Sequence, residues 1–114
     1  MAVTDDIGTT IRRVAARVPP AVVRIGRHGG RGCGIVVGDG LVLTNAHNLR
    51  GRTTLVTFAD GRAVQSRATG MDVDTDLVVL AVDTGDAPAL DWDDSPTELG
   101  ATVFAVASLT DGHR

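Results

Sequence analysis

Residues 34–45 read GIVVGDGLVLTN, and this stretch indicates the fold class. Two short runs of β-forming residues flank a Gly-Asp-Gly sequence that suits a turn. Five further runs rich in Val, Ile, Leu and Thr follow the same plan, with turn residues between them. The predicted strands cover residues 21–26, 34–37, 41–45, 53–58, 62–69, 77–82 and 102–107.

Strands this short and evenly spaced, without helical periodicity between them, favour a closed antiparallel β-barrel over a doubly wound α/β sheet. The clearest hairpin turn is Asp60-Gly61, because this dipeptide accommodates the positive φ angles of a tight turn. The 114 residues, 43% of them hydrophobic, suffice for one core in one domain. The expected fold class is therefore all-β.

Residues 4–18 carry the helical periodicity that the rest of the chain lacks. Pro19-Pro20 ends this segment, because proline has no amide hydrogen and restricts the residue before it to extended geometry. The sequence thus predicts an amphipathic helix with its proline stop over residues 1–20 and a barrel over residues 21–114. The apolar positions of the helix are Ile7, Ile11, Val14, Ala15 and Val18.

Charge is divided unevenly along the chain, whose net value is −3. All eleven basic residues are Arg; ten of them stand against four acidic residues in 1–70, and one stands against ten in 71–114. We expect the two parts to attract one another. With only Phe58, Phe104 and Trp92 to stack on bases, nucleic-acid binding is not expected.

The sequence contains no apolar run long enough to cross a bilayer, and its first residues, MAVTDDIGTT, lack the order of a secretory signal. As written, this predicts a cytoplasmic chain without a membrane partner; if residue 1 is not the natural start, the protein is expected to be secreted or periplasmic. Cys33 is the single cysteine, so it permits no internal disulfide, and we expect it to be a small buried thiol.

Two residues distant in the sequence are the candidates for chemistry. His47 follows the predicted strand 41–45, and Asp76 directly precedes the predicted strand 77–82. A carboxylate at the mouth of a buried strand can accept the Nδ1 proton of a histidine, fix its tautomer and stabilise the imidazolium. We therefore expect these two side chains to lie together.

Three segments, VPPAVVRI, GRGCGIVVGDGLVLTNAHNL and DTDLVVLAV, resemble in order and spacing the first half of a trypsin-like serine protease of the bacterial HtrA (Deg) type. The resemblance implies a six-stranded antiparallel β-barrel, the first of two whose interface forms the active cleft. It also implies that His47 is the catalytic general base, that Asp76 orients it, and that the substrate is an extended polypeptide. It implies no metal and no organic cofactor.

The sequence departs from the pattern of that family in several places. Cys33 stands where Ser is common, Asn48 follows the histidine instead of Val, and Val78 replaces Ala. The nucleophile motif G-[DN]-S-G-G of the second barrel does not occur, and glycines do not flank any of the three serines. An imidazole without a hydroxyl to deprotonate or donors for an oxyanion cannot run acyl transfer, so no peptidase activity is expected of this chain alone. The serines are Ser66, Ser95 and Ser108.

Two explanations of the missing nucleophile remain open. The chain can be the N-terminal part of a serine endopeptidase whose C-terminal barrel lies in the same or a separate chain, or a non-catalytic β-barrel interaction module derived from a protease. In the first case, the face that normally packs on the second barrel would be exposed, and homo-oligomers or aggregates are expected. The acidic residues 91–100 are either a solvated loop or a docking patch.

Metal sites are the competing interpretation of the same polar residues. Asp72, Asp74 and Asp76 match the opening of a calcium loop, but Leu77 and Asp83 occupy the positions that need Gly and Glu. Zinc ligands are also available, yet they lack the paired short spacings of structural zinc sites. We expect neither metal. The candidate zinc ligands are Cys33, His28, His47 and His113.

Overall fold

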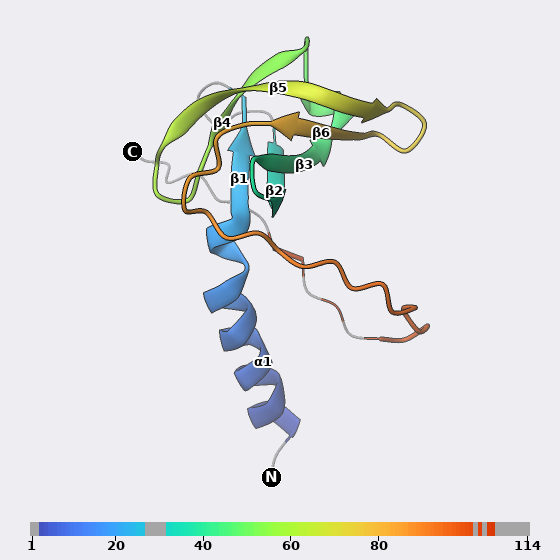
Figure 1. Cartoon of the computed structure of the whole chain (residues 1–114). Coiled ribbons are helices and arrows are strands. Elements are labelled where there is room, and N and C mark those ends of the chain that lie inside the picture. The colour runs from blue at the N-terminus through green and yellow to red at the C-terminus, as the bar shows by residue number, and fades with distance from the viewer. Residues whose placement is uncertain (1–2, 27–31, 102, 104, 107–114) are drawn as a thin grey trace.

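The computed structural model describes residues 3–26, 32–101, 103, 105 and 106. Within them, helix α1 (Val3–Arg17) and the 3-10 turn η1 (Pro19–Ala21) precede six strands, and the 3-10 turn η3 (Ala46–Asn48) follows the third strand (Figure 1). The strands are β1 (Val22–Ile25), β2 (Gly32–Gly38), β3 (Leu41–Asn45), β4 (Thr53–Thr57), β5 (Ala63–Asp72) and β6 (Leu77–Ala81).

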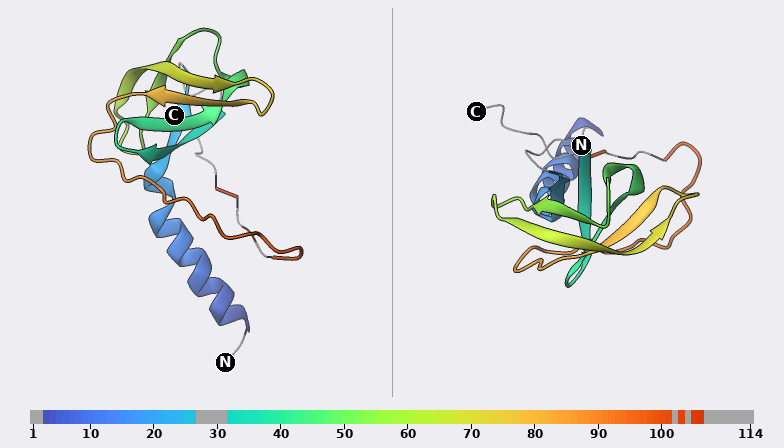
Figure 2. Two further views of the ribbon diagram at one scale, coloured as in Figure 1. Left: turned by 45° about the vertical axis from the view of Figure 1, so that its right-hand side comes forward. Right: turned by 90° about the horizontal axis from the view of Figure 1, so that it is seen from above.

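The six strands form a closed antiparallel barrel, which confirms the predicted fold class. Their order around the barrel is β1-β2-β3-β6-β5-β4, and pairing of β1 with β4 closes the ring (Figure 2). β3 and β6, far apart in the sequence, are direct neighbours, with Asn45 opposite Leu77 at one end of the pair. This neighbourhood positions the candidate site.

The prediction of a strand at residues 102–107 is wrong for those of its residues that the structure describes. Residues 103, 105 and 106 are not in a strand, and the remainder of that segment lies outside the described residues. The physical reason is that β1 and β4 already pair, so the closed barrel offers no edge to a seventh strand. The other predicted strands correspond to β1–β6, with β3 matching at both ends and β5 continuing three residues further to Asp72.

Inward-facing side chains fill the barrel, and most of them are β-branched. Strand residues alternate between the core and the surface, as in β2, where Gly34 and Val36 are buried between half-buried neighbours. Burying each Val, Ile or Leu side chain contributes about 1.5–3 kcal/mol. The core comprises Ala21, Val23, Ile25, Val36, Val42, Val56, Phe58, Val78, Leu80 and Val82.

Helix α1 has the predicted period, but its apolar stripe is not buried in the core. It extends away from one end of the barrel (Figures 1 and 2), and Ile7 and Ile11 remain about half exposed. Its end faces the segment that follows β6 across a hollow of about 470 Å³, lined by Val14 and Val18 on one side and by Leu90 and Trp92 on the other. In the described part of the chain, no helix is long and apolar enough to span a membrane.

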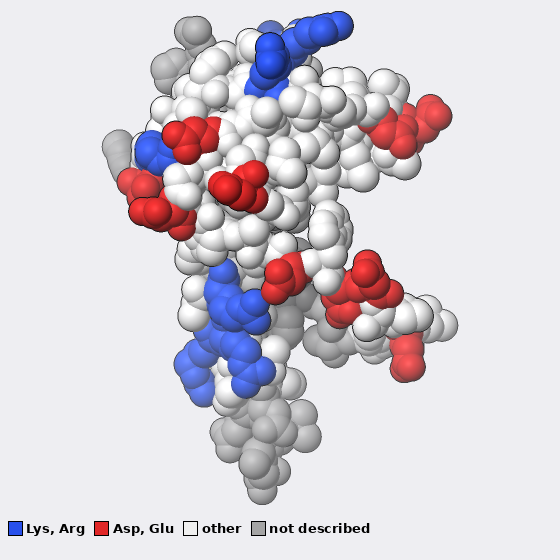
Figure 3. Space-filling model, viewed as in Figure 1, with Lys and Arg blue, Asp and Glu red and all other residues white. Residues whose placement is uncertain are grey.

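Opposite charges line the two sides of this hollow, as the uneven charge distribution suggested. Arg13 and Arg17 lie on the helix, and Asp91 and Asp93 lie on the facing segment (Figure 3). Among the described residues, no ion pair within 4.0 Å joins the two sides. The two sides therefore carry opposite charges without a direct ion pair between them among the residues described.

Close packing at the β2–β3 pair gives a prediction about stability. A Cβ atom added at Gly34 would lie 2.9 Å from the main-chain oxygen of Leu43 and 3.1 Å from a methyl carbon of Val42. Because backbone cannot easily move aside, Gly34→Ala should lower the free energy of unfolding by about 1–3 kcal/mol. Thermal unfolding followed by circular dichroism measures this as a fall in Tm of about 4–8 °C per kcal/mol.

Gly70→Ala is the matched control, because Gly70 also lies in a strand but a Cβ there meets no atom within 4 Å. Its Tm should stay the same or rise slightly, since alanine restricts the unfolded chain. Equal losses of Tm in the two variants would contradict the contact with the main-chain oxygen of Leu43 as the cause of the requirement for glycine.

Candidate active site

The structure brings His47 and Asp76 together, as expected from their positions at strand ends. His47 lies in the turn η3, directly after β3, and Asp76 directly precedes β6. Because Asn45 and Leu77 are register partners at the ends of these strands, the residues just beyond them meet at the rim of the barrel. The Nδ1 atom of His47 lies 2.5 Å from Oδ2 of Asp76.

Main-chain contacts hold Asp76 against the turn that carries the histidine. The main-chain N–H of His47 donates to Oδ1 of Asp76 at 2.8 Å, so both carboxylate oxygens are bound by one residue. The main-chain N–H of Ala46 and the side-chain amide of Asn45 donate to the main-chain oxygen of Asp76, at 2.9 and 3.1 Å. Asp76 is thus held at four points, three of them on the turn and one on the last residue of β3.

The backbone of Asp76 adopts an uncommon conformation that makes these contacts available. Its φ is +60°, and among the described residues it is the non-glycine residue with positive φ. Aspartate tolerates this left-handed region better than most residues, because its short polar side chain can bond locally. The bend turns the carbonyl and the carboxylate of one residue toward the same neighbouring turn.

Asn45 belongs to this arrangement although its sequence position did not predict it. Its side-chain amide donates to the main-chain oxygen of Asp76, so it acts on the backbone of the carboxylate residue and not on the imidazole. The signal available in the sequence was an amide residue two positions before the histidine, at the end of a strand. Only the pairing of β3 with β6 shows what that amide holds.

Hydrogen bonding favours the ionised form of Asp76. The pKa of its carboxyl lies below the ordinary value of 3.8, first because of the bond from the His47 ring, and further because of the main-chain N–H of His47, while partial desolvation opposes both. With Oδ2 ionised, Nδ1 of the ring is the donor, and in the neutral form of the ring Nε2 then carries the lone pair. Side-chain exposure of 70% for His47 leaves the ring accessible to a reactant.

The lowered pKa predicts how this contact responds to acid. Since the folded pKa is depressed, the contact stabilises the fold above the unfolded value near 3.8 and is lost as the pH falls through the folded value. In a carboxyl-carbon NMR titration, Asp76 should titrate below 3.8, and His47→Ala should move its midpoint up toward that value.

The same spectrum contains a reference for this titration. The pKa of Asp93 is also lowered, by bonds from Ser95 on the segment after β6, where His47 takes no part. Its midpoint should therefore stay unchanged in His47→Ala. An Asp76 midpoint that also stays unchanged would contradict the assignment of the ring as the main cause of the shift.

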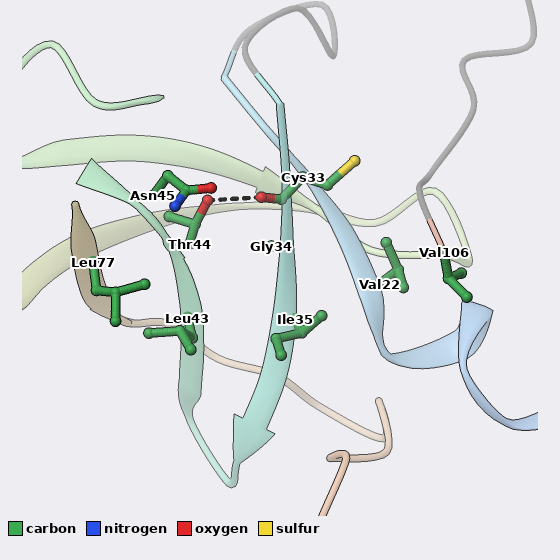
Figure 4. A pocket seen from close by; sticks show the side chains of 9 residues that line it. All are labelled: Val22, Cys33, Gly34, Ile35, Leu43, Thr44, Asn45, Leu77 and Val106. Atoms are coloured by element: carbon green, nitrogen blue, oxygen red, sulfur yellow. Dashed lines mark hydrogen bonds between the residues drawn. The ribbon is translucent and has the colours of Figure 1, made fainter. Parts of the chain in front are cut away.

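An apolar hollow of about 210 Å³ lies over β2 and β3 and reaches the first residue of β6 (Figure 4). Leu77, which directly follows Asp76, and Asn45, two residues before His47, form part of its wall. Cys33 also lines it and is half-buried, so the expectation of a buried thiol is wrong in degree. The reason is strand alternation, which places Gly34 inward and its neighbour Cys33 toward the hollow. The other lining residues are Val22, Gly34, Ile35, Leu43, Thr44 and Val106.

The candidate metal ligands do not form a cluster within the described ranges, where no group of three or more His, Cys, Asp or Glu side chains could hold a metal ion. His28 and His113 lie outside those ranges. The Oδ1 atom of Asp72 instead accepts a hydrogen bond from the main-chain N–H of Asp74 at 3.1 Å, as in a side-chain-capped turn.

Comparison with known proteins gives the family. The sequence profile described as "Trypsin-like peptidase domain" matches residues 32–114. Among curated relatives, a "Probable periplasmic serine endoprotease DegP-like" of Halomonas elongata is 38% identical over 80 residues, covering 68% of this chain and 17% of the relative. "Serine protease PepD" of Mycobacterium tuberculosis is 32% identical, covering 87% of this chain and 25% of the relative. The chain thus spans a quarter or less of the length of these two relatives.

Solved structures give the same result for the fold. A serine endoprotease from Yersinia pestis matches with a TM-score of 0.65 and 28% identity, over 75% of this chain and 34% of that one. The inactive form of the Rv3671c protease matches with a TM-score of 0.66 and 30% identity, over 77% and 44%. The chain therefore belongs to the trypsin-like peptidase domain family, and within it resembles the HtrA-type serine proteases.

Proposed function

We propose that this chain supplies the general base and its orienting carboxylate to a serine endopeptidase of the HtrA type. The observation that supports this is the contact of His47 Nδ1 with Asp76 Oδ2, at 2.5 Å, at the rim of a barrel of the trypsin-like family. The nucleophilic serine and the donors for the oxyanion belong, in this proposal, to a second barrel outside this chain. The substrate is an extended polypeptide.

The proposed reaction uses the two ring nitrogens of His47 differently. Nε2 accepts the proton of the serine hydroxyl as its oxygen attacks the scissile carbonyl, and later returns that proton to the leaving amine. Asp76 accepts the Nδ1–H bond throughout, keeps the ring in the tautomer with a free Nε2, and stabilises the imidazolium that forms. The bond to the main-chain N–H of His47 keeps the carboxylate from rotating away.

The second barrel needs a surface to dock on, and an apolar one lies beside the pair. Leu77, 40% exposed, lies next to Asp76 and lines the apolar hollow together with Leu43 and Ile35. In the absence of a partner, such a surface promotes self-association. Since one relative is named a periplasmic protease, we also propose a location outside the cytoplasm for the assembled enzyme.

The test of this proposal begins with the coding sequence that follows codon 114. The proposal expects a second barrel with a G-[DN]-S-G-G motif, and the joined protein should hydrolyse an unfolded protein such as casein and react with a fluorophosphonate at its serine. The 114-residue chain alone should do neither. A stop codon, with a monodisperse monomer and no hydrolysis in any combination, would support the non-catalytic interaction module instead.

A further inference from the structure

A short chain of buried polar groups lies on the inner side of the turn that carries His47. Asn48 is 6% exposed and Thr44 is 4% exposed. The side-chain amide of Asn48 donates to Oγ1 of Thr44 at 3.1 Å, and the Thr44 hydroxyl donates to the main-chain oxygen of Cys33 at 2.7 Å. These bonds connect the turn η3 through β3 to the first residues of β2.

The direction of each hydrogen bond follows from counting protons. A threonine hydroxyl has one proton, and Thr44 gives it to Cys33, so its oxygen can only accept from Asn48. An apolar residue at position 48 would leave that oxygen with one partner fewer in a nearly dry environment, which is costly. The amide N–H of Asn48 therefore supplies a partner that an apolar residue at this position would not supply.

The side chain of Asn48 is also tightly packed against the backbone of β2. A Cβ atom added at Gly32 would lie 2.8 Å from both the nitrogen and the oxygen of the Asn48 amide. The backbone of β2 thus packs directly on this amide, and the side chain has little room to change its rotamer. Asn48 links the turn to the barrel by packing and by hydrogen bonding at once.

The turn of three residues is consequently held from two sides. On the outer side, Asp76 binds the main-chain N–H groups of Ala46 and His47; on the inner side, Asn48 is tied to Thr44. The N–H of Leu49 closes the turn on the oxygen of Ala46 at 3.0 Å. A shift of Asn48 would therefore move the backbone of His47 relative to Asp76.

We propose that Asn48 is a positioning residue, which through Thr44 sets the backbone of the turn so that the His47 ring stays aligned on Asp76. Its importance for catalysis rests on the proposed function. The HtrA-type pattern has valine at this position, which fills space but cannot donate to Thr44. This chain therefore fixes its histidine by a polar anchor that the common residue does not provide.

The experiment compares two variants with a matched control by NMR of the labelled chain. Asn48→Leu removes the donor at similar size, and Thr44→Val removes the hydroxyl. Thr84→Val is the control, because Thr84 is also buried and its Oγ1 accepts a hydrogen bond from the main-chain N–H of Gly40 at 3.0 Å. Gly40 directly precedes the first residue of β3, at the end of the strand away from His47. Thr44→Val decides the question if Asn48→Leu does not fold.

The expected readouts are local to the pair. In Asn48→Leu and Thr44→Val, hydrogen exchange of the His47 amide should accelerate at least about tenfold, and the pKa of Asp76 should rise toward its ordinary value. Thr84→Val should lose a similar amount of Tm with both readouts unchanged, and Thr44→Ser should restore them. Identical changes in all three valine and leucine variants, or none, would overturn the positioning role.

These measurements use the chain without its partner, so they are independent of whether the joined protein is a protease. In the joined protein, Asn48→Leu should lower kcat about 10- to 100-fold with little change in KM, because the ring is misplaced while substrate contacts persist. If Asn48→Leu alters the NMR readouts but kcat stays normal, Asn48 would still position the turn, but this positioning would have no importance for catalysis. Absence of activity in the unmodified joined protein would contradict the proposed function alone.

Discussion

Replacing Asp76 with asparagine in the chain joined to the proposed second barrel should lower kcat by about 10⁴-fold. An asparagine keeps the shape of the side chain, and its oxygen can still accept from the main-chain N–H of His47. Its NH₂ group, however, would face Nδ1 and donate to it, so the ring would adopt the tautomer protonated at Nε2. That nitrogen could then no longer take the serine proton.

The measurement is steady-state hydrolysis of a peptide ester or amide, with kcat and KM determined separately. KM should change little, because in the proposed mechanism Asp76 contacts the ring of His47 and not the substrate. Asp39→Asn is the control, because Asp39 is exposed in the turn between β2 and β3, at the opposite end of β3 from the pair. Activity near that of the unmodified enzyme in Asp76→Asn would exclude Asp76 as the residue that orients the histidine.

The sequence was sufficient to predict the barrel because local signals agree along most of it. Strand β3 is the clearest case, since a turn before it and polar residues after it leave only Leu41–Asn45 for an extended, half-buried segment. The prediction of a seventh strand at residues 102–107 was wrong although its local sequence pattern is as good as that of the other strands. What excludes it is the pairing of β1 with β4, a non-local fact that closes the sheet.

Only part of the candidate site could be predicted, because its contacts also depend on the pairing of strands that are distant in the sequence. That His47 and Asp76 lie at strand ends follows from the pattern, but their contact depends on β3 and β6 being neighbours in a register that sets Asn45 opposite Leu77. The roles of Asn45 and Asn48 depend on single hydrogen bonds, to the backbone of Asp76 and to the hydroxyl of Thr44. Neither bond has a periodic signature in the sequence.

Helix α1 shows that a periodic pattern can predict an element without predicting how it packs. Its spacing correctly predicts a helix that ends at the proline pair, yet Ile7 and Ile11 are about half exposed and not packed in the barrel. Period indicates which side of a helix is apolar, whereas what covers that side depends on tertiary structure. The domain division at residue 20 remains a prediction.

Replacing His47 with alanine should have the largest effect, a fall in kcat of about 10⁶-fold. In the proposed mechanism the ring accepts the proton of the serine and donates it to the leaving amine, so its removal eliminates both functions. The measurement is the same hydrolysis assay, extended to long incubations and high enzyme concentrations. Reaction with a fluorophosphonate should be lost in parallel, because that reaction also needs an activated serine.

The double variant His47→Ala/Asp76→Asn separates a shared mechanism from two independent ones. In the proposed mechanism Asp76 acts on the reacting groups only through the imidazole that it contacts, so without the ring its carboxylate has nothing left to orient. The double variant should therefore be no slower than His47→Ala alone, whereas independent contributions would multiply to about 10¹⁰. A clear further fall in kcat on adding Asp76→Asn would mean that this carboxylate acts on substrate or serine directly, and the role proposed for it would have to be abandoned.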